Sequence, residues 1–155
     1  MPNIAIIGGG FSGTLLALHL LRRCPGDVDI SLIERSISFG RGAAYSTGNP
    51  SHLLNVPAGR MSAFHDQPHD FLDWLRQASD ADVPRPVTEQ SFVPRRLFGA
   101  YVRHLLNREL KTSGQSDRLK LIRGDARDIE RADSGLVIHL DRWRSIETDL
   151  VVLAV

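Results

Sequence analysis

Three glycines near the start of the chain have the spacing of a phosphate-binding turn. Gly8, Gly10 and Gly13 form the pattern G-x-G-x-x-G directly after the apolar run 4–7. In such a turn the first glycine allows a sharp bend, the second lets the backbone approach phosphate oxygens, and the third lets helix and strand pack closely. Backbone N–H groups at the start of the following helix, together with its dipole, attract an anion. This stretch therefore predicts the binding of a pyrophosphate.

An acidic residue stands where a dinucleotide-binding protein needs one. Glu34 ends a second apolar run, 29–33, and lies 21 positions after Gly13, close to the roughly 20 expected. A carboxylate there accepts hydrogen bonds from both hydroxyls of an adenosine ribose and repels a 2′-phosphate. The bound dinucleotide should therefore carry no phosphate on that ribose, as in NAD or FAD.

These residues require a strand, a turn, a helix and a second strand, and the surrounding sequence predicts that unit. The β-branched run 4–7 suits a strand that is buried on both faces of a parallel sheet. Leucines and alanines over 15–21 predict the helix, which Pro25 and Gly26 should stop. The run 29–33 predicts the second strand. The fold class expected is α/β, with a Rossmann-like parallel sheet and flanking helices.

A second glycine-rich loop follows, in which Arg41 lies between Gly40 and Gly42. Glycines let the backbone pass close to a ligand, and a guanidinium offers a forked donor that matches phosphate. A surface loop with a solvated arginine explains this segment equally well, so both interpretations stay open. The irregular segment 49–61 has too many apolar residues for an idle loop, so a flat cofactor ring or the following helix should cover it.

The later part of the chain predicts another helix and several strands. Apolar residues recur at helical spacing over 97–110. Residues 119–123 predict a third strand, and shorter strands are expected over 128–130, 136–140 and 146–155. Only 146–155 is strongly apolar, which suits a central strand. The short strands predict a small antiparallel ribbon that crosses over the parallel sheet.

The segment from His65 to Asp70 offers two imidazoles and two carboxylates within six residues. A metal site is one interpretation, but no further ligand set is apparent, so no metal is predicted. The apolar residues of 71–75 predict a helix. Asp66 would be its cap, Pro68 would lie in its first turn, and Asp70 would face its positive end.

Composition argues against several classes of protein. The chain has 155 residues, a net charge of +1 and 42% hydrophobic residues, which fits one globular domain and gives no support for a nucleic-acid or membrane partner. The first strand begins too early for a signal peptide, and no apolar segment is long enough to span a bilayer. A single cysteine excludes an internal disulfide. We therefore expect a cytoplasmic protein whose partners are a dinucleotide and a small-molecule substrate.

Taken together, these residues resemble the two-dinucleotide-binding flavoprotein superfamily. More narrowly, they resemble a bacterial group of FAD/NAD(P)-binding oxidoreductases that is distantly similar to the amino-acid N-hydroxylating monooxygenases. The similarity covers essentially the whole chain and rests on the segments 8–13, 34–35, 39–46, 52–58, 71–75 and 92–99. The first two segments are shared by many dinucleotide folds, whereas the others are much more specific.

The resemblance implies FAD as the cofactor and assigns residues to each part of it. The backbone of Phe11 and Ser12 would help the glycines to hold the pyrophosphate, while Arg35 would lie beside the adenine. Arg41 would approach the phosphates or the ribityl chain. Asn55 would lie toward the flavin ring, and Ala126 would pair its backbone with the adenine edge. The predicted cofactor-binding residues are thus Gly8, Gly10, Phe11, Ser12, Gly13, Glu34, Arg35, Arg41, Asn55 and Ala126.

The resemblance also implies that the chain is the FAD-binding portion of a flavin oxidoreductase that NAD(P)H reduces. The complete enzyme would have a monooxygenase-like chemistry. Residues 1–155 would form one Rossmann-like FAD-binding domain, with 36–94 as a loop-rich insertion. Such proteins continue past the last strand into an NAD(P)H-binding region, so we expect the chain to be truncated at its C-terminal end and incomplete for catalysis. No catalytic residue is predicted. An NAD-dependent dehydrogenase domain and a non-catalytic dinucleotide-binding module stay open as alternatives.

Overall fold

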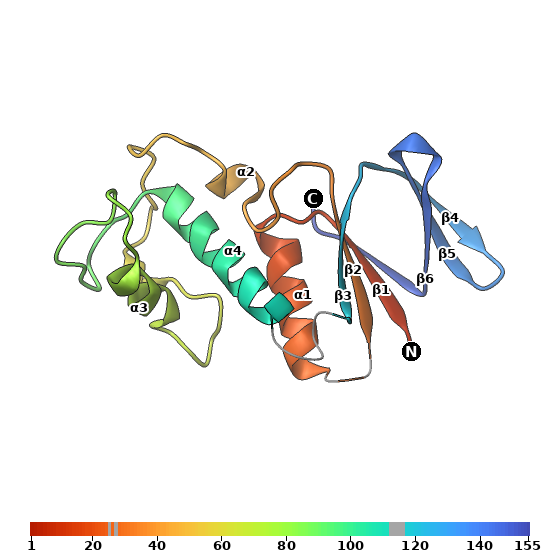
Figure 1. Ribbon diagram of the computed structural model, residues 1–155, viewed down its shortest axis with the longest axis horizontal. Helices are drawn as coiled ribbons and strands as arrows, with labels where there is room; N and C mark the ends of the chain where they lie inside the picture. Colours follow the sequence, from red (N-terminus) through yellow and green to blue (C-terminus); the bar gives the residue numbers. More distant parts are fainter. Residues whose placement is uncertain (25, 27, 112–116) are drawn as a thin grey trace.

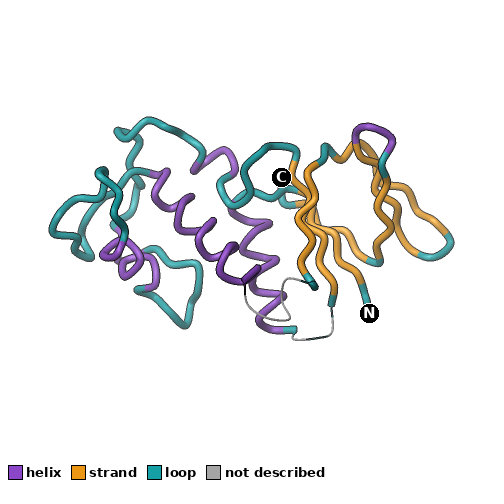
Figure 2. Tube along the Cα trace, viewed as in Figure 1, coloured by secondary structure: helices purple, strands orange, loops and turns teal. Residues whose placement is uncertain are grey.

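The computed structural model describes residues 1–24, 26, 28–111 and 117–155. A four-stranded parallel sheet lies in the middle of the molecule (Figure 1). Helices pack against one of its faces, and a three-stranded antiparallel sheet packs against the other (Figure 2). The α/β fold class expected from the sequence is therefore confirmed, and so is the antiparallel ribbon.

The parallel sheet has the strand order β3-β2-β1-β7. Its strands are β1 (Asn3–Ile7), β2 (Asp29–Glu34), β3 (Leu119–Arg123) and β7 (Leu150–Leu153). Ile6 of β1 pairs with Leu32 of β2 on one side and with Val152 of β7 on the other. Because both faces of β1 and β2 are covered, apolar residues predominate in the buried middle of these strands.

Two long helices cover one face of this sheet. They are α1 (Phe11–Arg23) and α4 (Arg95–Lys111). Alternate strand residues join buried leucines of both helices in the main core, which includes Ile6, Ile30, Leu32, Leu18, Leu21, Leu97 and Leu105. The helix predicted after the glycine turn is confirmed, although Pro25 of its predicted stop lies outside the described residues. Neither these helices nor any other in the described chain is long and apolar enough to cross a membrane.

The antiparallel sheet connects β3 to β7. Its strands are β4 (Ala126–Ala132), β5 (Gly135–Leu140) and β6 (Ser145–Thr148), and the one-turn helix η2 (Asp141–Trp143) joins β5 to β6. Ala5 and Ile33 of the parallel sheet meet Ile138 and Leu140 of β5 in a second, smaller core. Alternation along β1 and β2 thus decides which residues face the helices and which face the antiparallel sheet.

The expectation of one central strand over 146–155 is wrong. The chain forms β6 in the antiparallel sheet, turns at Asp149, and then forms β7 at the edge of the parallel sheet. Asn3 causes the break, because its N–H group donates to the Asp149 carboxylate at 2.7 Å and its carbonyl accepts from the Asp149 N–H group at 3.0 Å. Leu150 and Leu153 are more than half exposed on this edge strand. An apolar run therefore did not identify a central strand.

Residues 36–94 contain three short helices between irregular segments. These helices are α2 (Gly42–Tyr45), η1 (Ala58–Arg60) and α3 (Asp70–Gln77). The N-cap of α3 is His69, so the predicted roles of Asp66 as a cap and Pro68 in the first turn are wrong. Asp70 does lie in the first turn, where it accepts a hydrogen bond from the Tyr101 hydroxyl of α4. Burial and this hydrogen bond raise the pKa of Tyr101 well above its ordinary value.

Candidate functional site

A cavity of about 610 Å³ opens at the carboxyl edge of the parallel sheet. Its wall combines the turn after β1, residues from the segment between β2 and α2, α2 itself, and the turn between β3 and β4. Figure 1 shows these parts meeting where α1 begins, close to the C-terminus. Open α/β sheets bind ligands at this edge, where the loops leave the carboxyl ends of the strands. The fold therefore directs attention to this cavity.

The first glycine turn can only be built from residues without a Cβ atom. Gly8 has a φ of 105°, and a Cβ on it would lie 2.4 Å from the Ala154 carbonyl oxygen. A Cβ on Gly13 would lie 1.9 Å from the Gly8 carbonyl oxygen, which is far closer than two non-bonded atoms can approach. Gly13 is buried behind the turn, where it lets α1 pack directly onto the end of β1.

The first turn of α1 faces the cavity with its backbone donors. Gly10 is the N-cap, and no side chain among the described residues donates or accepts a capping hydrogen bond there. No acidic residue lies in the first turn. The early N–H groups and the positive end of the helix dipole are therefore available to an anion, and Phe11 and Ser12 line the cavity beside them.

Glu34 is held in a fixed orientation at the end of β2. One carboxylate oxygen accepts a hydrogen bond from the Gly9 N–H group at 2.8 Å, and the other accepts from the Ser36 N–H group at 2.8 Å. Each oxygen retains a second acceptor position, because a carboxylate offers about four. The carboxylate thus joins the glycine turn to the next loop and still presents acceptors to the cavity that it lines.

The second glycine loop packs on the first through backbone atoms. The Gly40 N–H group donates to the Gly9 carbonyl at 2.7 Å. Gly42 has a φ of 60°, and a Cβ on it would lie 3.2 Å from the Gly10 Cα atom. A Cβ on Gly10 would in turn lie 3.1 Å from the Gly42 Cα atom. These close contacts bring α2 and Arg41 to the cavity wall.

Arg41 is partly buried and has one buried nitrogen without a partner among the described residues. Within the described chain, its Nε atom is buried and makes no hydrogen bond. Burial and the nearby charges of Arg103 and Arg96 lower the pKa of Arg41. Arg96, by contrast, forms ion pairs with Asp80 and Asp82. A buried donor atom without a hydrogen bond is costly, so the Nε atom of Arg41 is suited to an acceptor that enters the cavity.

The turn between β3 and β4 forms the third side of the cavity. The Gly124 N–H group donates to the Glu34 carbonyl at 3.0 Å, which fixes this turn beside the end of β2. The Asp125 N–H group donates to the Asp141 carboxylate at 3.1 Å, and this bond and Arg144 lower the pKa of Asp141. Ala126 begins β4 and lines the cavity with Gly124 and Asp125.

Most of the predicted residues are brought together by the fold. The residues that line the cavity are Gly8, Gly10, Phe11, Ser12, Glu34, Arg35, Arg41 and Ala126. Gly13 supports the turn from behind. Asn55 is exposed and does not line the cavity, so its role toward the flavin ring stays a prediction.

Tyr45 and Gly99 contribute to the site, although sequence reasoning gave neither a role. Tyr45 lines the cavity from the end of α2. Gly99 lies inside α4, and a Cβ on it would lie 2.8 Å from the Tyr45 carbonyl oxygen and 3.1 Å from the Arg41 Cγ atom. Glycine inside a helix costs about 1 kcal/mol relative to alanine, so it signals a close approach. That signal was present in the sequence, but it did not reveal which segment approaches.

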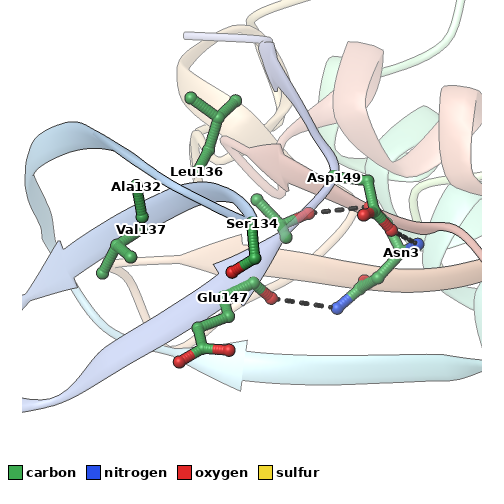
Figure 3. A pocket seen from close by; sticks show the side chains of 8 residues that line it. Asn3, Ala132, Ser134, Leu136, Val137, Glu147 and Asp149 are labelled. Atoms are coloured by element: carbon green, nitrogen blue, oxygen red, sulfur yellow. Dashed lines mark hydrogen bonds between the residues drawn. The ribbon is translucent and has the colours of Figure 1, made fainter.

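A second, smaller cavity of about 290 Å³ lies at the amino end of β1, between β1 and the antiparallel sheet (Figure 3). Its lining includes Asn3, Ser134, Glu147 and Asp149. The Asn3 side chain donates to the Glu147 carbonyl at 3.2 Å. None of the predicted cofactor-binding residues lines it. Elsewhere in the described residues, no three His, Cys, Asp or Glu side chains lie close enough to hold a metal ion.

Comparison with known protein families shows the family to which the chain belongs. A family model described as FAD-NAD(P)-binding matches residues 5–155. The chain belongs to the FAD-NAD(P)-binding family. A search of curated proteins finds no match. The match covers every part of the chain that builds the cavity at the carboxyl edge.

Several solved structures have the same fold over this chain. A closed cyclohexanone monooxygenase aligns with 100% of the chain at a TM-score of 0.63 and 17% identity. A flavin-containing monooxygenase from Stenotrophomonas maltophilia aligns with 99% of it at a TM-score of 0.62 and 20% identity. The peptidyl tryptophan dihydroxylase QhpG aligns with 98% at a TM-score of 0.52 and 20% identity. The chain spans 26%, 38% and 32% of these proteins, respectively, so the likeness concerns the fold of one part of each.

The residues present fit a dinucleotide on two structural observations. The buried Nε atom of Arg41 lacks a partner within the described chain, which suits a phosphate oxygen. The close packing of Gly10 on Gly42 leaves a backbone surface beside the start of α1 that any Cβ would disturb. Donors for a pyrophosphate and acceptors for a ribose are thus present in one cavity.

Proposed function

We propose that this chain is the FAD-binding domain of an NAD(P)H-dependent flavin oxidoreductase with monooxygenase-like chemistry. The observation that carries the proposal is the cavity that joins the uncapped start of α1, the Glu34 carboxylate and the unpaired Arg41. Membership of the FAD-NAD(P)-binding family supports the choice of cofactor. The monooxygenases among the similar folds support the class of reaction.

Each part of the cofactor has residues that would hold it. The first turn of α1, with the backbone of Gly10, Phe11 and Ser12, would bind the pyrophosphate, and Arg41 would add a charge-assisted hydrogen bond. Glu34 would accept the hydroxyl groups of the adenosine ribose. The backbone of Ala126 would lie at the adenine edge.

FAD supplies two-electron redox chemistry when it is bound, and the protein contributes binding and orientation. Glu34 is fixed by two backbone donors, so it binds the ribose without first reorganising. Arg41 already carries the desolvation that a phosphate contact requires. The site is therefore preorganised for an anionic dinucleotide.

Titration of the purified chain with FAD, NAD⁺ and ADP tests this function. We expect FAD to bind at micromolar concentration or below, ADP to bind more weakly, and the visible absorption of FAD to shift on binding. Tighter binding of NAD⁺ than of FAD would favour a dehydrogenase domain instead. In a longer protein that includes an NAD(P)H-binding region, a bound flavin that neither NADH nor NADPH reduces would favour a non-catalytic module. Failure of all three ligands to bind would refute the dinucleotide site.

A further inference from the structure

We propose that Tyr45, with the ring of Phe11, forms an aromatic subsite for the half of the dinucleotide that lies beyond the pyrophosphate. In FAD that half is the ribityl chain and the isoalloxazine ring. This inference rests on the proposed function, because it assigns a further part of the same cavity. The subsite makes Tyr45 a determinant of FAD binding that has no part in binding the adenosine half.

The position of α2 decides which half of the ligand meets Tyr45. Glu34 and the turn that contains Ala126 border the cavity on the side of β2 and β3, where adenosine would lie. Figure 1 shows α2 on the other side of the glycine turn, beside the start of α1 and the first turns of α4. A dinucleotide whose pyrophosphate lies at the start of α1 must therefore direct its second half toward α2.

The Tyr45 ring is held firmly by two other aromatic rings. It packs edge-on against Phe11 with ring centroids 5.4 Å apart, and it packs against Phe98 at 5.1 Å. Phe11 and Phe98 are themselves 5.5 Å apart, so the three rings form one closed cluster. Phe98 is buried, whereas Phe11 and Tyr45 are half-buried and line the cavity. The cluster fixes an aromatic surface that a flat heteroaromatic ring can contact.

The surrounding residues keep that surface open and in place. Ala43 and Ala44 line the cavity with Tyr45, and their side chains are small. Gly99 of α4 lets the Tyr45 backbone approach, since a Cβ there would lie 2.8 Å from its carbonyl oxygen and 3.1 Å from its Cβ atom. If Tyr45 only filled the core, neither the open cavity in front of it nor its partial exposure would be needed.

The experiment compares FAD with ADP, because ADP contains the adenosine half and both phosphates but lacks the flavin half. In Tyr45→Ala we expect the Kd for FAD to rise about tenfold, the order of a lost aromatic stacking contact, and the Kd for ADP to stay within about twofold. Tyr45→Phe keeps the ring and should retain FAD affinity within about threefold. Phe92→Ala, an exposed phenylalanine outside the cavity, is the matched control and should change neither constant.

Tyr45→Leu guards against a folding defect, because leucine fills most of the same volume against Phe11 and Phe98. It should bind ADP as the wild type does and still lose FAD affinity. Equal weakening of FAD and ADP, or unchanged FAD affinity in both variants, would overturn the subsite and leave the dinucleotide site intact. A wild-type chain that binds neither ligand would instead overturn the proposed function, and the subsite with it.

Discussion

The two ends of β1 carry cavities of different character. At the carboxyl end, the cavity of about 610 Å³ is lined by Arg35 and Arg41 beside the positive start of α1, and also by the carboxylates of Glu34 and Asp125. At the amino end, a cavity of about 290 Å³ is lined by Glu147 and Asp149 and by no lysine or arginine. Each end also contains one buried polar atom without a partner among the described residues, the Nε atom of Arg41 and the Oδ1 atom of Asn3.

The difference between the two orphaned atoms indicates which cavity receives a ligand. A buried amide oxygen without a hydrogen bond costs about 1–3 kcal/mol, whereas an uncompensated buried charge costs several. At the amino end the remaining polar groups of Asn3 are bonded to Asp149, Glu147 and Thr148. That end is a junction between two sheets. At the carboxyl end, the unpartnered atom belongs to a partly buried guanidinium, which suits the anion proposed for this cavity.

A substitution in the glycine turn is expected to give the largest effect at the carboxyl-end cavity. Gly13→Ala places a Cβ 1.9 Å from the Gly8 carbonyl oxygen, so α1 must move away from β1. We expect a loss of stability of about 4 kcal/mol, the range of a severe core defect, together with loss of ADP binding. Thermal unfolding and ADP titration measure both. Gly48→Ala is the control, since nothing lies within 4 Å of its added Cβ, and a variant Gly13→Ala that behaved like it would contradict the structure.

Replacement of Arg41 should separate binding from stability. Arg41→Met removes the unpaired charge, and we expect ADP to bind about 10- to 100-fold more weakly, the order of a lost charge-assisted hydrogen bond. The melting temperature should stay level or rise, because a desolvated cation has been removed. Arg142→Met, at a side chain that is 87% exposed, is the control. Unchanged ADP affinity in Arg41→Met would show that the phosphates lie elsewhere.

A different pattern is expected at the amino end of β1. Asn3→Ala loses the hydrogen bond from the Asn3 side chain to the Glu147 carbonyl but also removes the unpartnered Oδ1 atom, so the two effects oppose and stability should change by less than about 1 kcal/mol. The main-chain bonds of Asn3 to Asp149 are retained. Affinity for FAD and ADP should stay within about twofold, as isothermal calorimetry would measure. A large loss of affinity would mean that the two ends of β1 are coupled.

The smallest expected effect on stability concerns Arg96, which, in contrast to Arg41, forms ion pairs within the described residues. The hydrogen bond from Arg96 lowers the pKa of Asp80, so the folded state holds this carboxylate ionised below the ordinary value near 4. The stabilisation is therefore fully present above that value and is lost as pH falls through the lowered pKa. Asp80→Asn should cost about 0.5 kcal/mol at neutral pH, given that both side chains are partly exposed.

Denaturant unfolding of the wild type and Asp80→Asn, from neutral pH down to about pH 3, measures this difference. The two curves should converge at the acid end. Asp73→Asn is the control, because its ion pair with Arg76 leaves both side chains more than half exposed. Curves that stay parallel down to the lowest pH would exclude the proposed ion-pair contribution.

Much of the fold could be predicted because its signals are local. The glycine turn and the β-branched run before it indicate strand, turn and helix within the first 23 residues. The periodicity over 97–110 predicts α4 in the same way. The prediction of a single strand over 146–155 was wrong because the length of a strand depends on the residues with which it pairs. Asn3, at the other end of the chain, ends β6 and begins β7 by bonding to Asp149.

The residues of the candidate site also divide into those that the sequence predicts and those that depend on tertiary packing. Gly8, Gly13 and Glu34 were found from spacing, because the phosphate turn and its acidic partner have fixed separations. Arg41 was left undecided between a ligand contact and a solvated loop. The buried Nε atom favours a contact, and the packing of Arg41 depends on Gly99 of α4, more than fifty positions away.

The sequence by itself determined the glycine turn, the acid at the end of β2 and the α/β fold class, because each depends on a local pattern or on a fixed spacing along the chain. Only the tertiary structure placed Tyr45 and Arg41 at the cavity wall and Asn55 away from it. That placement follows from backbone packing between the two glycine loops and α4. These contacts between distant segments are possible only because glycine has no side chain. The sequence shows where a Cβ is missing, but it does not show which segment packs into that space.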